Sequence, residues 1–239
     1  MQNKHMALHL FDIEGTIAPV DYVHKTMFPY AEANLDAFLS LNPLSKEMFQ
    51  LLAAEHESDV NQGLYPGKLT DNYKDISLYL KFLIKIDRKS TVLKNIQGKI
   101  WKSGFETNKL TSIIYPDTLE YFKYLKQNNN RIMIYSSGSV EAQKLYLKYS
   151  DQGDLSEFVS GNFDTTTGPK KEKSSYEKIM TVTTSVITSA NGKKITFYTD
   201  IPAEAEAARE AGFAVYLVNR TSEPIETDFP VIESFNSLM

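Results

Sequence analysis

Two carboxylates and a glycine interrupt a short apolar run near the start of the chain, in the segment LHLFDIEGTIAP. Asp12 and Glu14 directly follow the apolar residues, and Gly15 comes next. An unpaired charge at the end of a buried strand costs several kcal/mol, so a partner must compensate for it. A metal ion or a reacting group would be such a partner. The segment therefore predicts a chemically active turn.

Two later apolar runs also end on a polar residue. RIMIY, which starts at Arg131, stops at Ser136, and ITFYT, which starts at Ile195, stops at Asp200. One such residue alone is best explained as a turn former or a helix cap. Three of them at equivalent places favour a shared site, because ligands of parallel sheets bind beyond the carboxyl ends of the strands.

The segments around these runs indicate the sheet that must position them. The runs are short and apolar on both faces, which is typical of buried parallel strands. Helical periodicity follows in GSVEAQKLYLKY and in IPAEAEAAREAG, where Pro202 suits a first helical turn and Gly212 a stop. FAVYLV, from Phe213, is a further predicted strand. The predicted fold class is therefore α/β, with a Rossmannoid core built on an open parallel sheet.

About ninety residues separate the first predicted strand from the second part of this core, far more than a crossover needs. Their periodicity is helical: AEANLDAFL places Leu35, Phe38 and Leu39 on one face. NYKDISLYLKFLIKID does the same with Tyr73, Ile76, Leu80, Leu83 and Ile84. We predict a core of residues 1–18 and 112–239, and an inserted helical cap domain of residues 19–111.

Composition excludes several classes of protein. The chain has 239 residues, a formal net charge of -4 and no cysteine, so disulfides, thiolate metal sites and a cysteine nucleophile are excluded. The acidic balance argues against nucleic-acid binding and adhesion to an acidic membrane. No apolar run approaches the roughly 18 residues of a membrane span. We expect a cytoplasmic protein that binds neither nucleic acid nor membrane.

The sequence D-x-(D/E)-G-T at the end of a first strand, here Asp12 to Thr16, resembles the nucleophile motif of the haloacid dehalogenase superfamily. A carboxylate can attack phosphorus only if the charge between the two anions is neutralised, which calls for a hard cation such as Mg²⁺. Asp12 and Asp200 offer oxygen ligands for it. Glu14 could protonate the leaving oxygen and then deprotonate the hydrolytic water.

Two further motifs follow the superfamily pattern in the expected order. YSSGS, which contains Ser136 and Ser137, offers hydroxyl and N–H groups at a helix start, where phosphate is favoured. GPKKE offers Lys170 and Lys171 to neutralise a phosphoryl oxygen. Each motif alone is a weak signal, but the motifs taken in order at predicted strand ends are a strong one.

Several longer segments of the sequence resemble one family, acireductone synthase, whose members are the bifunctional enolase-phosphatases of methionine salvage. The matching blocks are DIEGT with Glu14, FPY, DRKSTVLKNIQGKIW, IYSSGSVEAQKLYL, FDTTTGPKKEKSSY, and the Asp200 motif with Glu204 four residues later. The resemblance implies a small phosphorylated diketone, 2,3-diketo-5-methylthiopentyl 1-phosphate, as the substrate. Its products would be the acireductone 1,2-dihydroxy-5-(methylthio)pent-1-en-3-one and phosphate. A monomer is expected.

The resemblance also implies a role for each matching residue. Asp12 would be the nucleophile and a metal ligand. Glu14 would be the acid and base, with its backbone carbonyl on the metal, and Asp200 would complete the site of one Mg²⁺ per chain. Substrate would be bound by Ser136, Ser137 and Lys170, of which Lys170 is also catalytic.

Two departures from the family pattern and three other interpretations accompany this hypothesis. Pro169 precedes the lysine, and VNRTSEP, around Arg220, stands where an Arg-Pro-Gly-Asn stretch is common. A generic small-molecule phosphatase of the same superfamily is the alternative. A hydrolytic dehalogenase is disfavoured, because its chemistry does not need the proton donor Glu14 or the metal-binding Asp200. A catalytically silent binding protein on this fold is also disfavoured, because it would have no reason to keep Asp12, Glu14, Lys170 and Asp200 together.

Overall fold

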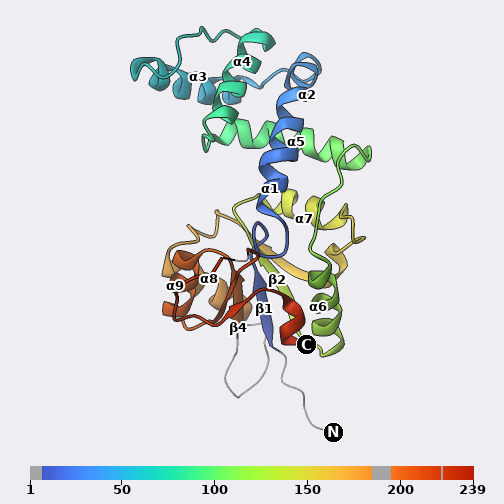
Figure 1. Ribbon diagram of the computed structural model, residues 1–239. Coiled ribbons are helices and arrows are strands. Elements are labelled where there is room, and N and C mark those ends of the chain that lie inside the picture. Colours follow the sequence, from blue (N-terminus) through green and yellow to red (C-terminus); the bar gives the residue numbers. More distant parts are fainter. Residues whose placement is uncertain (1–6, 185–194, 222) are drawn as a thin grey trace. The chain divides into compact units, whose positions relative to one another are not determined.

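The computed structural model describes residues 7–184, 195–221 and 223–239, and the chain divides into two compact units (Figure 1). The sheet unit joins Met1–Tyr22 to Thr111–Met239, and the helical unit is Val23–Leu110. The predicted core and cap domains have borders after residues 18 and 111; their assignment as functional domains stays a prediction. Within the described ranges, no helix is both long and apolar enough to cross a membrane.

Among the described residues, the sheet has six strands, all parallel, in the order β3-β2-β1-β4-β5-β6. The four predicted strands are β1, β2, β4 and β5, which confirms the predicted α/β class. β3 and β6 were not predicted, because β3 has the weakly apolar sequence VSGNF and β6 has two residues. The bounds are β1 Leu8–Phe11, β2 Arg131–Tyr135, β3 Val159–Phe163, β4 Ile195–Thr199, β5 Ala214–Val218 and β6 Val231–Ile232.

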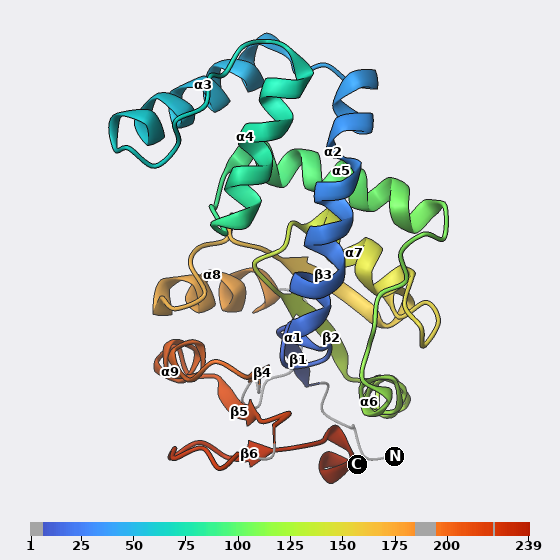
Figure 2. The same cartoon turned by 45° about the horizontal axis from the view of Figure 1, so that its top comes forward.

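Helices of the sheet unit cover both faces of this sheet (Figure 2). On one face, Tyr176 of α8 and alanines of α9 pack in a cluster with Leu10 of β1. On the other, Phe235 of η3 packs edge-on against Phe11. As predicted, Pro202 begins α9, and Gly212 follows its end with a φ of 88°. The bounds are α1 Val20–Tyr22, α6 Pro116–Gln127, α7 Val140–Lys148, η2 Ser156–Phe158, α8 Lys173–Thr184, α9 Pro202–Glu210 and η3 Phe235–Leu238.

A histidine of β1 is buried among aromatic residues on the second of these faces. His9 is 9% exposed, and its Nδ1 lies 2.9 Å from the hydroxyl of Tyr198. That hydroxyl also lies 2.9 Å from the hydroxyl of Tyr121. Burial lowers the pKa of His9 from 6.5 to about 4, because the charged ring would lose its hydration.

We expect His9 to make the protein less stable in mild acid. In the unfolded chain His9 takes up a proton below its ordinary pKa of 6.5, whereas in the folded chain it does so only near pH 4. The free energy of unfolding therefore falls as pH drops through this window, by about 3 kcal/mol in total. His9→Phe should remove this part of the pH dependence, measured by urea unfolding between about pH 7.5 and pH 4. The same decline in both proteins would contradict the assignment.

The helical unit has its own apolar core. Leu35 and Leu39 of α2 are buried, and so are Ile76, Leu80 and Leu83 of α4, as the periodicity predicted. Tyr73 was expected in this core but is 36% exposed, because it is the first residue of α4. The bounds are η1 Val23–Met27, α2 Phe28–Leu41, α3 Lys46–Asn61, α4 Tyr73–Lys85 and α5 Thr91–Glu106.

Candidate active site

Three polar residues follow three neighbouring strands at their carboxyl ends. β1 lies between β2 and β4, and Asp12, Ser136 and Asp200 directly follow these strands. All three strands are parallel, so the three residues meet at one edge of the sheet, as predicted. The N–H of Asp12 donates to the carbonyl of Tyr198 in β4 at 3.0 Å. This hydrogen bond fixes the backbone of Asp12 beside β4.

Lys170 reaches the same edge and pairs with two carboxylates. Its Nζ lies 2.6 Å from Oδ1 of Asp12 and 2.8 Å from Oε2 of Glu204. The three side chains are almost completely buried, with exposures of 5 to 9%. Burial alone would lower the pKa of Lys170, but the charges of Asp12 and Glu204 outweigh burial and raise that pKa above its ordinary value. The lysine therefore stays charged beside Asp12.

The loop that carries Lys170 is held by hydroxyl groups of α8. The Tyr176 hydroxyl donates to the carbonyl of Lys170 at 2.7 Å, and the Ser175 hydroxyl donates to the carbonyl of Pro169 at 2.8 Å. Pro169 is one of the two departures from the family pattern. It accepts one of these hydrogen bonds through its carbonyl, and neither bond uses the N–H group that proline lacks. Lys170 therefore pairs with Asp12 despite this departure. The neighbouring Lys171 is exposed and does not join the cluster.

Glu204 is a member of the cluster that the predicted site set omitted. It lies in the first turn of α9, where it accepts a hydrogen bond from the Thr199 hydroxyl at 2.9 Å. Burial raises the pKa of Glu204, and the charge of Asp12 raises it further, against the opposing effect of Lys170. The sequence signal was its spacing of four residues from Asp200, which fits one helical turn at the strand end.

Glu14 points to the serine that follows β2. The Ser136 hydroxyl donates to Oε2 of Glu14 at 3.0 Å and accepts from the N–H of Gly138 at 3.2 Å. Burial raises the pKa of Glu14, and the nearby charge of Asp12 raises it further. A raised pKa suits a proton donor. Ser137, the second predicted substrate-binding serine, is exposed, and Ser139 caps α7 instead.

Asp200 has the features of a cation ligand. Among the residues that the structure describes, its buried Oδ1 has no hydrogen-bond partner, although a buried carboxylate oxygen is normally satisfied. Burial and the charge of Asp12 raise the pKa of Asp200 to about 7. Among the described residues, no group of three or more His, Cys, Asp or Glu side chains forms a metal site. Two carboxylates and the main-chain carbonyl of Glu14 would be a different, oxygen-only set, which fits Mg²⁺.

Gly15 makes room for the Asp200 carboxylate. Its φ is 76°, and a Cβ at this position would lie 2.2 Å from Oδ2 of Asp200. Any other residue would both strain the backbone and displace the carboxylate. Two reasons therefore require glycine at this position: the backbone has a positive φ, and the Asp200 carboxylate fills the space of a Cβ.

We expect Gly15→Ala to weaken metal binding by at least about tenfold, because it moves a proposed ligand. The Mg²⁺ concentration for half-maximal activity measures this effect. Gly153→Ala is the matched control: Gly153 has a φ of 91°, but a Cβ added there would meet no atom within 4 Å. The control should show the cost of the backbone strain without the clash, and it should keep its Mg²⁺ requirement. Equal Mg²⁺ requirements in the two variants would refute the steric argument.

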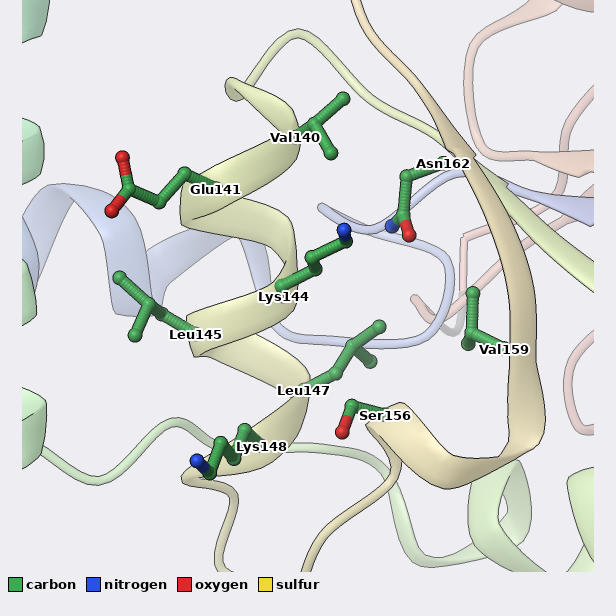
Figure 3. A pocket seen from close by; sticks show the side chains of 9 residues that line it. All are labelled: Val140, Glu141, Lys144, Leu145, Leu147, Lys148, Ser156, Val159 and Asn162. Carbon is green, nitrogen blue, oxygen red and sulfur yellow. The ribbon is translucent and has the colours of Figure 1, made fainter.

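A cavity lies beside α7, away from this cluster. Its volume is about 550 Å³, and residues of α7, η2 and β3 line it (Figure 3). Asp12, Glu14, Lys170 and Asp200 are not among the lining residues. The candidate site is therefore defined by the side chains at the strand ends.

A family model and curated relatives identify the family of this chain. The model of haloacid dehalogenase-like hydrolases matches residues 6–212, and the chain therefore belongs to the haloacid dehalogenase-like hydrolases. Curated proteins that resemble the chain include several named enolase-phosphatase E1. The chain is 42% identical to that of Leptospira interrogans, over 100% of this chain and 99% of the relative. The chain is 36% identical to the enolase-phosphatase E1 of Anopheles gambiae, over 95% of this chain and 80% of that relative. These matches confirm the family resemblance seen in the sequence.

Solved structures share the fold. The UTR4 protein of Saccharomyces cerevisiae is similar with a TM-score of 0.75 and 28% identity, over 98% of this chain and 100% of that one. The hydrolase YfnB of Bacillus subtilis has a TM-score of 0.58 at 14% identity, over 98% and 97%. At that identity the second likeness concerns the fold alone.

Proposed function

We propose that the chain is an Mg²⁺-dependent enolase-phosphatase. It converts 2,3-diketo-5-methylthiopentyl 1-phosphate to the acireductone 1,2-dihydroxy-5-(methylthio)pent-1-en-3-one and phosphate, in L-methionine salvage. The observation that carries the proposal is the pairing of Asp12 with Lys170 beside the unpartnered Oδ1 of Asp200. The choice of substrate is supported by 42% identity to an enolase-phosphatase E1 along the whole chain.

Asp12 is the proposed nucleophile. Its carboxylate attacks phosphorus and forms an aspartyl phosphate, while the bond from phosphorus to the substrate oxygen breaks. Water then attacks the same phosphorus, the acyl phosphate bond breaks, and Asp12 returns as a carboxylate with release of inorganic phosphate. The N–H of Ile13 donates to Oδ1 of Asp12 at 2.8 Å, so this N–H and Lys170 orient the carboxylate.

Glu14 is the proposed acid and base. It gives its proton to the substrate oxygen that leaves phosphorus, and later accepts a proton from the attacking water. Its raised pKa supports the first of these transfers. The hydrogen bond from Ser136 keeps its carboxyl group at the strand edge.

Phosphate binding is assigned to three groups. Lys170 supplies a positive charge for a phosphoryl oxygen. Ser136 and Ser137 supply hydroxyl and backbone N–H groups just before α7, where the helix dipole also favours an anion. The exposed Ser137 is the one of the pair that a ligand can reach without displacing a buried side chain.

Asp12, Asp200 and the main-chain carbonyl of Glu14 would hold one Mg²⁺. When bound, the ion neutralises the charge between the carboxylate and the phosphate and acts as a Lewis acid on oxygen. Asp200 fits this role because its buried Oδ1 accepts no hydrogen bond from the described part of the chain.

We expect chelation to stop phosphate release and added Mg²⁺ to restore it. Asp200→Ala should raise the Mg²⁺ concentration needed for half-maximal rate by at least about tenfold, since a charged oxygen ligand is lost. Direct calorimetric titration of Mg²⁺ onto the protein gives a second measurement. Full activity of a protein shown by metal analysis to contain no divalent ion would rule out the metal site.

Turnover of the diketo phosphate against a panel of ordinary phosphomonoesters tests the function. The expected result is a kcat/KM for the diketo phosphate at least about a hundredfold above the panel, with the acireductone followed by its ultraviolet absorbance. Similar values for all esters would identify a generic phosphatase instead. No phosphate release from any of them would favour a silent binding protein.

The role of the helical unit as a cap domain, the monomeric state and the cytoplasmic location are part of the same proposal. They can be tested by cap-residue substitutions read out on substrate choice, by sedimentation, and by cell fractionation.

A further inference from the structure

An arginine near the C-terminus donates two hydrogen bonds to the turn that carries Asp12 and Glu14. Arg220 lies outside residues 6–212, which match the family model. Its Nε and Nη2 nevertheless donate to the main-chain carbonyl of Thr16, at 3.0 and 2.9 Å. Thr16 is two residues beyond Glu14. The turn is therefore in direct contact with a residue 204 positions later in the chain.

The guanidinium group of Arg220 is held by an ion pair and two aromatic rings. Its Nη1 lies 2.7 Å from Oδ2 of Asp117, and the two side chains are 11% and 10% exposed. The rings of Tyr115 and Phe235 lie 4.3 and 4.9 Å from the guanidinium carbon. A planar group with donors in a fixed fork can bridge a carbonyl and a carboxylate at once, which a lysine ammonium does less well.

Asp117 links the arginine to the C-terminal segment. Its Oδ2 also accepts from the Ser234 hydroxyl and from the N–H of Phe235, both at 2.8 Å. Burial would raise the pKa of Asp117, but the hydrogen bonds from Arg220, Phe235 and Ser234 outweigh burial and hold that pKa below its ordinary value. The carboxylate therefore stays charged and keeps Arg220 in place.

The turn itself is tightly packed. The carbonyl of Ile13 accepts from the N–H groups of Thr16, Ile17 and Ala18 at 3.0 to 3.2 Å. Gly15 lies against the Asp200 carboxylate, with no room for a Cβ. A shift of Thr16 would therefore move the neighbouring Glu14 and disturb the contact between Gly15 and Asp200.

We infer that Arg220 is a positioning residue for this turn, and that Asp117, together with Ser234 and Phe235, holds Arg220 in place. The inference rests on the proposed function, because it concerns the placement of Asp12 and Glu14 for phosphoryl transfer. A misplacement of about 1 Å can lower a rate by about a hundredfold. Arg220→Ala should accordingly lower kcat by about 10- to 100-fold and change KM by less than about threefold.

Chemical rescue separates positioning from a general loss of structure. Arg220→Ala leaves a space between Tyr115 and Phe235 that matches a guanidinium ion. Guanidinium chloride at about 50 mM should raise kcat of the variant by at least about fivefold, whereas methylammonium chloride should not, because it lacks the planar fork. Amide hydrogen exchange in residues 13–18 should be faster in the variant and slower again with guanidinium.

Arg209→Ala is the matched control. Arg209 also pairs with an aspartate, Asp228, and lies 4.4 Å from the ring of Phe229, but it is exposed. Its replacement should leave kcat and the exchange of residues 13–18 unchanged.

Three outcomes decide the inference. An active parent with a kcat of Arg220→Ala within about threefold refutes the positioning role alone, whereas a parent that releases no phosphate refutes the proposed function. A loss of kcat that guanidinium does not restore, and that runs parallel to a fall in melting temperature, also refutes the positioning role.

If Arg220→Ala does not fold, Arg220→Lys takes its place. Its kcat should fall by about tenfold while its melting temperature stays unchanged. An unchanged kcat in that variant overturns the inference.

Discussion

Phosphate release will fall by at least about a thousandfold when Asp12 is replaced by asparagine. The amide cannot act as the nucleophile, so formation of the aspartyl phosphate is lost. A thousandfold corresponds to about 4 kcal/mol in the barrier. Asparagine keeps the size of the side chain and an oxygen for the N–H of Ile13, and Glu204 still pairs with Lys170. The fold should therefore persist, and the loss should be one of chemistry.

Steady-state phosphate release at saturating Mg²⁺ measures this loss, and mass spectrometry of acid-quenched protein detects the phosphorylated peptide. Asp154→Asn is the control: Asp154 is exposed and accepts a hydrogen bond from the N–H of Ser156 at 2.9 Å, but it is not part of the candidate site. It should retain the parent rate. Release from Asp12→Asn within about tenfold of the parent, or about 1.4 kcal/mol, would mean that Asp12 is not the nucleophile.

Lys170→Met should reduce both activity and stability. The substitution leaves the buried carboxylates of Asp12 and Glu204 without their shared cation. Removal of one partner from a buried ion pair costs about 3–5 kcal/mol, so the free energy of unfolding in urea should fall by that order. Loss of the charge that would face the phosphoryl group should lower kcat by about 10²- to 10³-fold.

Two further variants separate the loss of stability, caused by uncompensated carboxylates, from the loss of activity, caused by the missing positive charge. Lys170→Met combined with Glu204→Gln removes one of the two uncompensated charges, so it should recover most of the stability and none of the activity. Lys171→Met changes the exposed neighbouring lysine and should affect neither quantity. A double variant as unstable as Lys170→Met, or an active one, would contradict the proposed double role of Lys170.

The parts of the fold and site that could be predicted have local signals. Asp12 and Asp200 each end a compact apolar run, and parallel pairing brings such strand ends to one edge of the sheet. Pro202 and Gly212 mark the start and stop of α9 because of their own backbone preferences. Lys170 and Lys171 have no local difference in charge or size. Only the family resemblance pointed to Lys170, and its position at Asp12 depends on the hydroxyl groups of α8.

The parts that were missed depend on distant residues. β3 carries glycine and asparagine, so its strand conformation comes from pairing with β2 more than from its own composition. Glu204 was seen as part of a motif, but its role as a partner of Lys170 requires a contact between the loop that carries Lys170 and the first turn of α9. Arg220 and Thr16 have no pattern in common, and only the folded chain shows that one donates to the other.

The position of β1 in the sheet also determines when the edge that carries the candidate active site can form during folding. β1 ends at Phe11, yet Leu8 aligns with Arg131 on one side and with Ile195 on the other. Such long sequence separations make pairing slow, because closing a long loop costs entropy before any contact is gained. On the ribosome, β1 therefore emerges long before either of its neighbours has been made. Asp12 and Asp200 meet only after β4 has left the exit tunnel, so the edge with the candidate active site is among the last parts of the chain to assemble.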